Sequence, residues 1–135
     1  MACRYLLDTN ICIYIAKHRP PEVLRRFEVL QVGDVAMSFI TFGELKYGAE
    51  KSNNSKRAHS KLDRLVELIP LLSIPQGAAM HYGRIRKELE RAGRPIGANN
   101  LWIAAHALAE KLILVSNNTK EFQRVSKLSL ENWVN

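Results

Sequence analysis

The stretch Arg4-Tyr5-Leu6-Leu7-Asp8-Thr9-Asn10 decides the fold, because a short apolar run ends at an acid and helix-capping residues follow it directly. The apolar run predicts a buried strand over residues 4–7. Thr9 and Asn10 offer capping side chains, which predict a helix through Lys17. The same order of strand and helix recurs along the chain, and this alternation predicts a parallel sheet covered on both faces, an α/β sandwich.

The other elements are read from short apolar runs and from the Pro, Gly and polar residues that separate them. Further strands are predicted over residues 35–38, 71–74 and 112–115, with an edge strand around Leu128 and Leu130. Pro75 suits the first turn of a helix that ends near Gly93. The remaining helices are expected over residues 21–30, 40–51, 53–69, 99–111 and 119–124.

The composition is that of an ordinary globular domain, since 47% of the 135 residues are hydrophobic and 24% are charged. We expect a single domain over residues 1–135, large enough to fold without disulfide bonds or a structural metal. The sequence has neither an apolar run of about 18 residues nor a signal-peptide pattern. Cys3 and Cys12 lack metal-binding spacing, so we expect a reducing, cytoplasmic location.

The net charge is the first indication of a partner. Lys and Arg number 20 against 13 Asp and Glu, which gives a formal net charge of +7. Basic surfaces favour polyanions, and nucleic acid is the commonest of these. A basic protein without such a partner explains the charge equally well.

Polar residues follow three of the predicted strands, at the carboxyl ends where parallel sheets bind ligands. Asp8 ends the first strand, Ser38 ends the strand over 35–38, and Ser116 with Asn117 and Asn118 follows the strand over 112–115. For Asp8 taken alone, capping the next helix is the more common role. The two Asn residues have the same ambiguity.

Glu44 and Asn100 lie on predicted helices that face this edge of the sheet. Glu44 shares a helix face with Ile40 and Gly48, where a carboxylate is costly unless it is paired or bound to metal. A buried ion pair or an exposed face explains Glu44 equally well, and a first-turn hydrogen bond is the simpler role of Asn100. Jointly, the oxygen atoms of Asp8, Glu44, Asn100 and Asn118 suit a hard cation such as Mg²⁺ or Mn²⁺.

Segments that contain these residues resemble, in order and spacing, the motifs of PIN-domain ribonucleases, and specifically the VapC toxins of bacterial VapBC toxin–antitoxin modules. The first is Tyr5-Leu6-Leu7-Asp8-Thr9-Asn10, and the others span residues 39–48, 93–104, 115–122 and 130–133. The resemblance covers essentially the whole chain. It implies a three-layer sandwich in which helices flank a mostly parallel central sheet.

The resemblance also implies an activity and partners. It indicates a Mg²⁺-dependent endoribonuclease, with Mn²⁺ as a possible substitute, that leaves 5′-phosphate and 3′-hydroxyl ends. The most similar subgroup is the enteric type, which cleaves initiator tRNA in the anticodon loop. The implied partners are the RNA, a VapB antitoxin and a second copy of the chain in a homodimer within a toxin–antitoxin hetero-oligomer. The chain is expected to contact operator DNA only through the antitoxin. No association with a membrane is expected.

By resemblance, Asp8, Glu44 and the residue at position 100 hold the metal, and Asn118 occupies the fourth catalytic position. Asn10, Ser116 and Glu121 are expected to support them, although a plain surface role explains Glu121 equally well. The family has Asp where this chain has Asn100, which keeps a carbonyl acceptor but loses the charge. We therefore expect an inactivated variant, engineered or natural. The alternative is a non-catalytic co-repressor that binds the antitoxin at its own operon.

Two surfaces are assigned to the macromolecular partners. Basic residues before the third motif are expected to follow the RNA backbone, although a solvated helix face explains them equally well; they are Arg84, Arg86, Lys87, Arg91 and Arg94. The helices over 40–51 and 53–69 carry Tyr47, Leu65 and Leu68, which are expected to be exposed and to suit an antitoxin helix. His106, in an Ala-rich helix, is expected to be structural.

Overall fold

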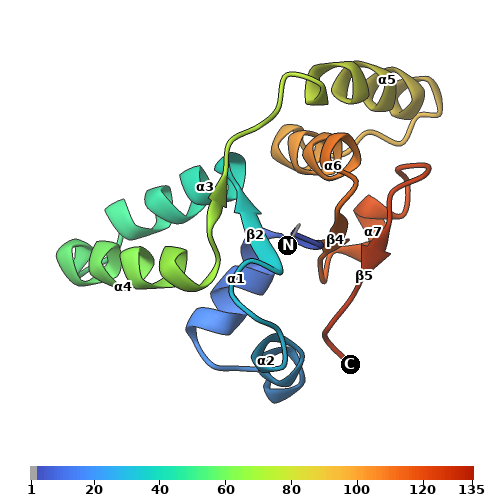
Figure 1. Ribbon diagram of the computed structural model, residues 1–135. Helices are drawn as coiled ribbons and strands as arrows, with labels where there is room; N and C mark the ends of the chain where they lie inside the picture. Colours follow the sequence, from blue (N-terminus) through green and yellow to red (C-terminus); the bar gives the residue numbers. More distant parts are fainter. Residues whose placement is uncertain (1–2) are drawn as a thin grey trace.

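The computed structural model describes residues 3–135 and is built on a five-stranded sheet of order β3-β2-β1-β4-β5 (Figure 1). Every neighbouring pair of strands is parallel. The strands are β1 (Tyr5–Leu7), β2 (Val35–Ser38), β3 (Leu71–Leu72), β4 (Ile113–Val115) and β5 (Leu130–Glu131). The α/β prediction is confirmed, and the sheet is parallel throughout.

Helices cover both faces of the sheet and give the expected three layers (Figure 1). The helices are α1 (Thr9–Ala16), α2 (Pro21–Glu28), α3 (Phe39–Glu50), α4 (Ser55–Leu68), α5 (Ala78–Arg91), α6 (Ala98–Glu110) and α7 (Thr119–Phe122). Leu6 belongs to the core under α5 and α6, whereas its neighbour Leu7 belongs to the core with α1, α2 and α4. Both are fully buried, which explains why β1 is apolar without alternation.

Three helix starts differ from the predictions. Asp8 caps α1, because its Oδ1 accepts the Ile11 N–H at 3.0 Å, so neither Thr9 nor Asn10 is the cap. Helix α5 begins at Ala78, since Pro75 lies in the preceding turn and its carbonyl accepts the Ala78 N–H at 3.0 Å. Helix α6 begins at Ala98 after Gly97, which places Asn100 inside its first turn.

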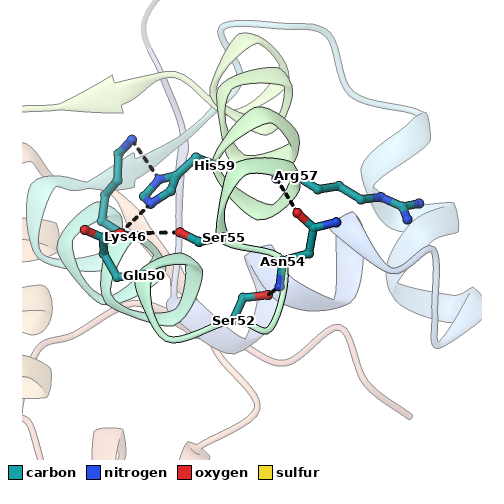
Figure 2. Close-up of polar contacts among 7 residues, drawn as sticks. All are labelled: Lys46, Glu50, Ser52, Asn54, Ser55, Arg57 and His59. Atoms are coloured by element: carbon teal, nitrogen blue, oxygen red, sulfur yellow. Dashed lines mark hydrogen bonds and ion pairs between the residues drawn. The ribbon is translucent and has the colours of Figure 1, made fainter.

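A polar network ties α3 to α4, as Figure 2 shows. His59 lies between two α3 side chains, with Nε2 at 3.1 Å from Glu50 Oε2 and Nδ1 at 3.5 Å from Lys46 Nζ. Asn54 caps α4 by accepting the Arg57 N–H at 3.2 Å. The two helices therefore form a hairpin with a defined geometry.

The apolar residues predicted for the antitoxin face separate into exposed and buried ones. Tyr47 is 65% exposed and Leu68 is 46% exposed, as expected. Leu65 is only 7% exposed, so that prediction was wrong. Leu65 packs into the core shared with α1 and α2, a tertiary contact that the helical spacing of α4 could not reveal.

His106 is buried in α6, and its Nδ1 lies 3.0 Å from the Ser38 hydroxyl at the start of α3. Burial lowers the pKa of His106, which keeps the ring neutral near pH 7. The pair joins α3 to α6 inside the core, as expected for a structural histidine. No helix within residues 3–135 has the length and apolar character that a bilayer crossing requires.

Trp133, which follows the last strand, packs between α2 and the sheet. The indole is 2% exposed, packs edge-on against Tyr5 at 5.5 Å between ring centroids, and donates to Glu131 Oε1 at 3.0 Å. The Arg26 guanidinium lies 5.2 Å from the indole centroid and 2.9 Å from Glu131. Trp133 thus joins α2, β1 and β5.

We expect Trp133→Ala to lower the free energy of unfolding by about 3–5 kcal/mol, because the substitution leaves a cavity between three elements. Urea denaturation followed by circular dichroism measures the change. Val29→Ala is the control, since Val29 is 80% exposed and its truncation should cost less than about 0.5 kcal/mol. A loss below about 1 kcal/mol for Trp133→Ala would show that the C-terminal segment is not part of the cooperative core.

Candidate active site

Asp8 lies at the carboxyl end of the central strand and is 5% exposed. Its backbone continues the sheet, since its N–H donates to the Val115 carbonyl at 3.0 Å, and its Oδ1 caps α1. The two roles considered for Asp8 in the sequence analysis, helix capping and ligand binding at the sheet edge, are compatible. The cap engages one carboxylate oxygen and fixes the side chain at the end of the sheet where β1 and β4 stop.

Glu44 reaches the same edge from the second turn of α3. Its Oε1 accepts a hydrogen bond from the Thr9 hydroxyl, and Thr9 follows Asp8 directly. The Thr9 hydroxyl also lies 3.4 Å from that of Thr41, which is fully buried. The carboxylates of Asp8 and Glu44 are close enough for their repulsion to contribute to the raised pKa of Asp8. The structure therefore brings the two predicted acids together.

Asn100 and Asn118 meet at a third carboxylate, that of Glu121. The Asn100 amide donates to Glu121 Oε1 at 3.3 Å, and the Asn118 amide donates to Oε2 at 3.2 Å. The backbone N–H of Gly97 also donates to Oε1, at 3.1 Å. Three N–H groups thus hold one carboxylate. Because each amide nitrogen points to Glu121, its carbonyl oxygen points elsewhere and stays available to a ligand.

Ser116 connects the two groups of residues. It is fully buried after β4, and its hydroxyl accepts the Asn118 N–H at 2.9 Å. The same hydroxyl lies close enough to the Asp8 carboxylate to lower its pKa. A continuous path of polar contacts therefore runs from Asp8 through Ser116 and Asn118 to Glu121, and on to Asn100.

The environment acts in opposite directions on the two best-defined acids. Burial raises the pKa of Asp8, and the nearby charge of Glu44 adds to the rise against the lowering effect of hydrogen bonds from Ser116 and Ile11. At Glu121 the Asn118 amide is the main cause of a lowered pKa. Asp8 is thus a carboxylate whose charge is poorly compensated by the protein, whereas that of Glu121 is well compensated.

The donor set fits a hard divalent cation in ligand type, since it consists of carboxylate and amide oxygens. A cation beside Asp8 would offset both the burial and the repulsion from Glu44. The number of acids is low, because no three His, Cys, Asp or Glu side chains within residues 3–135 are grouped as a metal site. Asn at position 100 offers an oxygen without a charge.

Several residues expected at the site lie apart from it. The side chain of Asn117 is exposed and donates to the Tyr14 hydroxyl at 3.4 Å. Asn10 is exposed, and only its backbone N–H acts on Asp8. The five basic residues expected to follow the RNA backbone are all exposed, as either of their two interpretations requires: Arg84, Arg86, Lys87, Arg91 and Arg94.

Sequence reasoning gave too little weight to Glu121 and missed Thr9 and Thr41. A signal for Glu121 exists in the sequence, because Asn118 and Glu121 have the spacing of a capping box at the start of α7. In this protein the Asn118 and Glu121 side chains form a hydrogen bond with each other, and the Asn118 side chain makes no capping hydrogen bond to the backbone. No pattern in the sequence could show that the start of α6 joins them, since Gly97 and Glu121 are 24 residues apart.

The chain is similar to known proteins in both sequence and structure. Residues 5–128 match the model of the PIN domain. The chain is 47% identical over 131 residues to ribonuclease VapC2 of Haemophilus influenzae and 45% identical over 130 residues to the tRNA(fMet)-specific endonuclease VapC of Shigella flexneri. These alignments cover 97% and 96% of this chain, and 98% of each relative.

The structure is similar to that of VapBC-1 from nontypeable Haemophilus influenzae. The TM-score is 0.90 at 41% sequence identity, over 97% of this chain and 98% of the matched chain. The identity and coverage are high enough to assign a family and not only a fold.

The raised pKa of Asp8 predicts how stability depends on pH in metal-free buffer. The folded-state pKa exceeds the unfolded value, so Asp8 contributes stability below the unfolded pKa of about 3.9 and loses it as pH rises through the folded-state pKa. Asp8→Asn keeps the cap acceptor and removes the charge. We expect this variant to be more stable than the wild type near pH 8, with the difference vanishing near about pH 3.

Urea denaturation with EDTA at several pH values measures this difference. Asp8→Ala is the control, because it removes the charge together with the cap, and losing the cap costs about 1 kcal/mol. A constant difference between Asp8→Asn and the wild type across the pH range would contradict the argument.

Proposed function

The chain belongs to the PIN-domain family, among the VapC ribonucleases of VapBC toxin–antitoxin modules, and we propose that Asp8, Glu44 and Asn100 form its metal-binding site. The protein is an endoribonuclease by family, and PIN-domain ribonucleases use divalent metal ions. We propose Mg²⁺ as that ion, with Mn²⁺ as a possible substitute.

One observation carries the site assignment: a buried carboxylate with a raised pKa lies beside a second carboxylate at the carboxyl edge of the sheet. A purely structural Asp8 would need only its bond to Ile11 as a helix cap. Nothing in that role requires Glu44 on the same edge. Two neighbouring acids of this kind support a cation site more than a capping role alone.

The residues of the chain have separate roles in this proposal. When bound, a divalent cation lowers the pKa of a water molecule and offsets charge on the scissile phosphate. Asp8 and Glu44 hold the cation, and Ser116 and Thr9 orient these two carboxylates through hydrogen bonds. Glu121 fixes the amides of Asn100 and Asn118. This turns the Asn100 carbonyl oxygen toward a ligand.

For the substrate we propose RNA, and specifically a tRNA. The Shigella flexneri relative is named a tRNA(fMet)-specific endonuclease, and it is 45% identical to this chain. The net charge of +7 suits a polyanion. The initiator tRNA, cut in its anticodon loop, is therefore the first substrate to test.

We further propose that Asn100 reduces the activity of this chain. The amide oxygen is a weaker ligand than a carboxylate and adds no charge to offset that of the metal. A second candidate function follows from the same observation, since no three acids are grouped as a metal site within the described residues. In that case the chain would bind the antitoxin and repress its operon without cutting RNA.

An apolar groove between α1, α2 and α4 suits the antitoxin, because matched structures are complexes of VapC with VapB. The groove has a volume of about 520 Å³. Its lining includes Ile15, Leu24, Phe27, Leu65 and Leu68, and Lys61 and Arg64 outweigh the single acid, Glu28. We propose that an antitoxin segment with apolar and acidic side chains binds there. The α3 surface around Tyr47, expected from the sequence, is not part of this lining.

Restoring the acid at position 100 tests the nuclease site. We expect Asn100→Asp to raise Mg²⁺-dependent cleavage of tRNA by roughly 10- to 100-fold, because the variant supplies the missing charged ligand. Incubation with total RNA, with and without Mg²⁺, followed by mapping of new 5′ ends measures the effect. Asp8→Ala in the Asn100→Asp background is the control and should abolish cutting.

The outcomes separate the two candidate functions. No cleavage by either the wild type or Asn100→Asp, with intact antitoxin binding, would establish the co-repressor. Equal cleavage by both would show that Asn100 does not limit activity. Cleavage that survives Asp8→Ala would refute the site assignment.

The groove generates a separate prediction. Leu68→Glu should weaken the complex with the VapB antitoxin of the same module by more than about tenfold, because it places a carboxylate in an apolar contact. Titration calorimetry measures the affinity. Met80→Glu is the control, since Met80 is 54% exposed on α5, across the sheet from the groove. Equal affinities for the two variants would exclude the groove as the antitoxin site.

A further inference from the structure

A small cavity of about 190 Å³ lies between α5 and the segment that leads from α5 into α6. Its apolar lining includes Leu89, Pro95, Ile96 and Leu101, while Tyr82, Arg86 and Glu90 form a polar side. The cavity is separate from the groove that we assign to the antitoxin, since the two share no lining residue.

The cavity adjoins the candidate active site. Ala98 and Leu101 line it and flank Asn100 in the first turn of α6. Gly97, which precedes Ala98, donates its N–H to Glu121 at 3.1 Å. A strand of RNA with its scissile phosphate near Asp8 and Asn100 would therefore place a neighbouring nucleotide within reach of this cavity.

Arg86 is held in a fixed orientation on the polar side. Tyr82, Arg86 and Glu90 are spaced four residues apart and form one row along α5. The Arg86 Nε donates to Glu90 Oε2 at 3.0 Å, and its Nη1 donates to the Tyr82 hydroxyl at 3.0 Å. A guanidinium has five N–H donors, so these two bonds leave donors on the Nη1 and Nη2 edge for a ligand.

An aromatic ring from α6 packs against one member of this row. The Tyr82 ring stacks on Trp102, with 4.0 Å between centroids and 17° between the planes. Trp102 belongs to α6, two residues after Asn100. Stability alone does not account for the arrangement, because an exposed ion pair such as Arg86 with Glu90 contributes little to folding.

We propose that this cavity binds one unpaired guanine base of an RNA substrate, with Arg86 donating to its O6 and N7 atoms. The inference rests on the proposed function and adds a base preference to it. A guanidinium edge matches the adjacent O6 and N7 acceptors of guanine, which adenine and uracil do not present. Unpaired cytosine presents the adjacent acceptors O2 and N3, but its smaller ring buries less apolar surface against the cavity lining. Unpaired RNA bases are bound by this combination of flat apolar contacts and edge hydrogen bonds.

A phosphate group is the competing ligand for Arg86, since a guanidinium also binds phosphate with two hydrogen bonds. The lining separates the two possibilities. A phosphate gains nothing from Leu89, Ile96 and Leu101, whereas the face of a base buries apolar surface against them. Arg86→Lys distinguishes the ligands in solution, because it keeps the charge and loses the paired donors.

Titration of the isotope-labelled protein with mononucleotides tests the proposal without any need for catalysis. The probes are GMP, AMP, CMP, UMP and inorganic phosphate, in EDTA, followed by the backbone amide signals of Ile96 and Ala98. We expect GMP to bind roughly tenfold more tightly than the other mononucleotides, and Arg86→Lys to remove this preference. Arg57→Lys, an exposed substitution on α4, should leave it unchanged.

A ligand variant complements the protein variants and covers the case in which Arg86→Lys fails to fold. GMP whose N7 is replaced by carbon should bind the wild-type protein roughly tenfold more weakly than GMP. Equal binding of all four mononucleotides, unchanged binding of the modified GMP, or competition by inorganic phosphate at these amides would each overturn the proposal.

This outcome is independent of the nuclease assay. Selective GMP binding in a chain that cuts no RNA, even as Asn100→Asp, would leave the base site standing and remove the proposed activity. RNA cleavage by a protein that does not prefer GMP would support the proposed nuclease activity and overturn the guanine site.

Discussion

The structure depends on one constraint, which is the placement of a carboxylate at the buried end of the central strand. Asp8 is 5% exposed and has a raised pKa because burial disfavours its charge. The fold supports this unfavourable group with a helix cap at Ile11 and a hydroxyl from Ser116. Such residues reduce stability and are typical of functional sites, where a ligand supplies the missing compensation.

The carboxylate of Glu121 differs from that of Asp8 in how its charge is compensated. Glu121 receives N–H donors from Gly97, Asn100 and Asn118, so its charge is satisfied within the protein. An Asp at position 100 would lose one of these bonds and place two carboxylates side by side. That arrangement requires a cation to be favourable, whereas the Asn form is stable without one. In the proposed site, the residue at position 100 thus sets how strongly the carboxylates favour a bound metal.

The sequence contained most of the fold because its strands are short apolar runs with polar residues at their ends. The strand-end rule predicted Asp8 and Ser116 as candidates, and their helix faces predicted Glu44 and Asn100. The resemblance then gave these residues their expected roles. Glu121 remained ambiguous, because its role depends on the meeting of α6 with α7. Leu65 was expected to be exposed and is buried, since only tertiary packing shows that it turns toward α1 and α2. Helical spacing describes one helix and does not identify its neighbours.

Helix α1 links the groove that we propose for the antitoxin to the proposed metal site. Asp8 caps the start of α1, and Ile15 and Ala16 at its other end line the groove. A helix rises about 1.5 Å per residue, so the groove and the carboxylate are separated by roughly 12 Å. An extended chain covers that distance in about four residues. An antitoxin segment seated in the groove needs only a short extension to reach Asp8 and Glu44, and a cationic side chain at its tip would meet the charge that the protein leaves uncompensated.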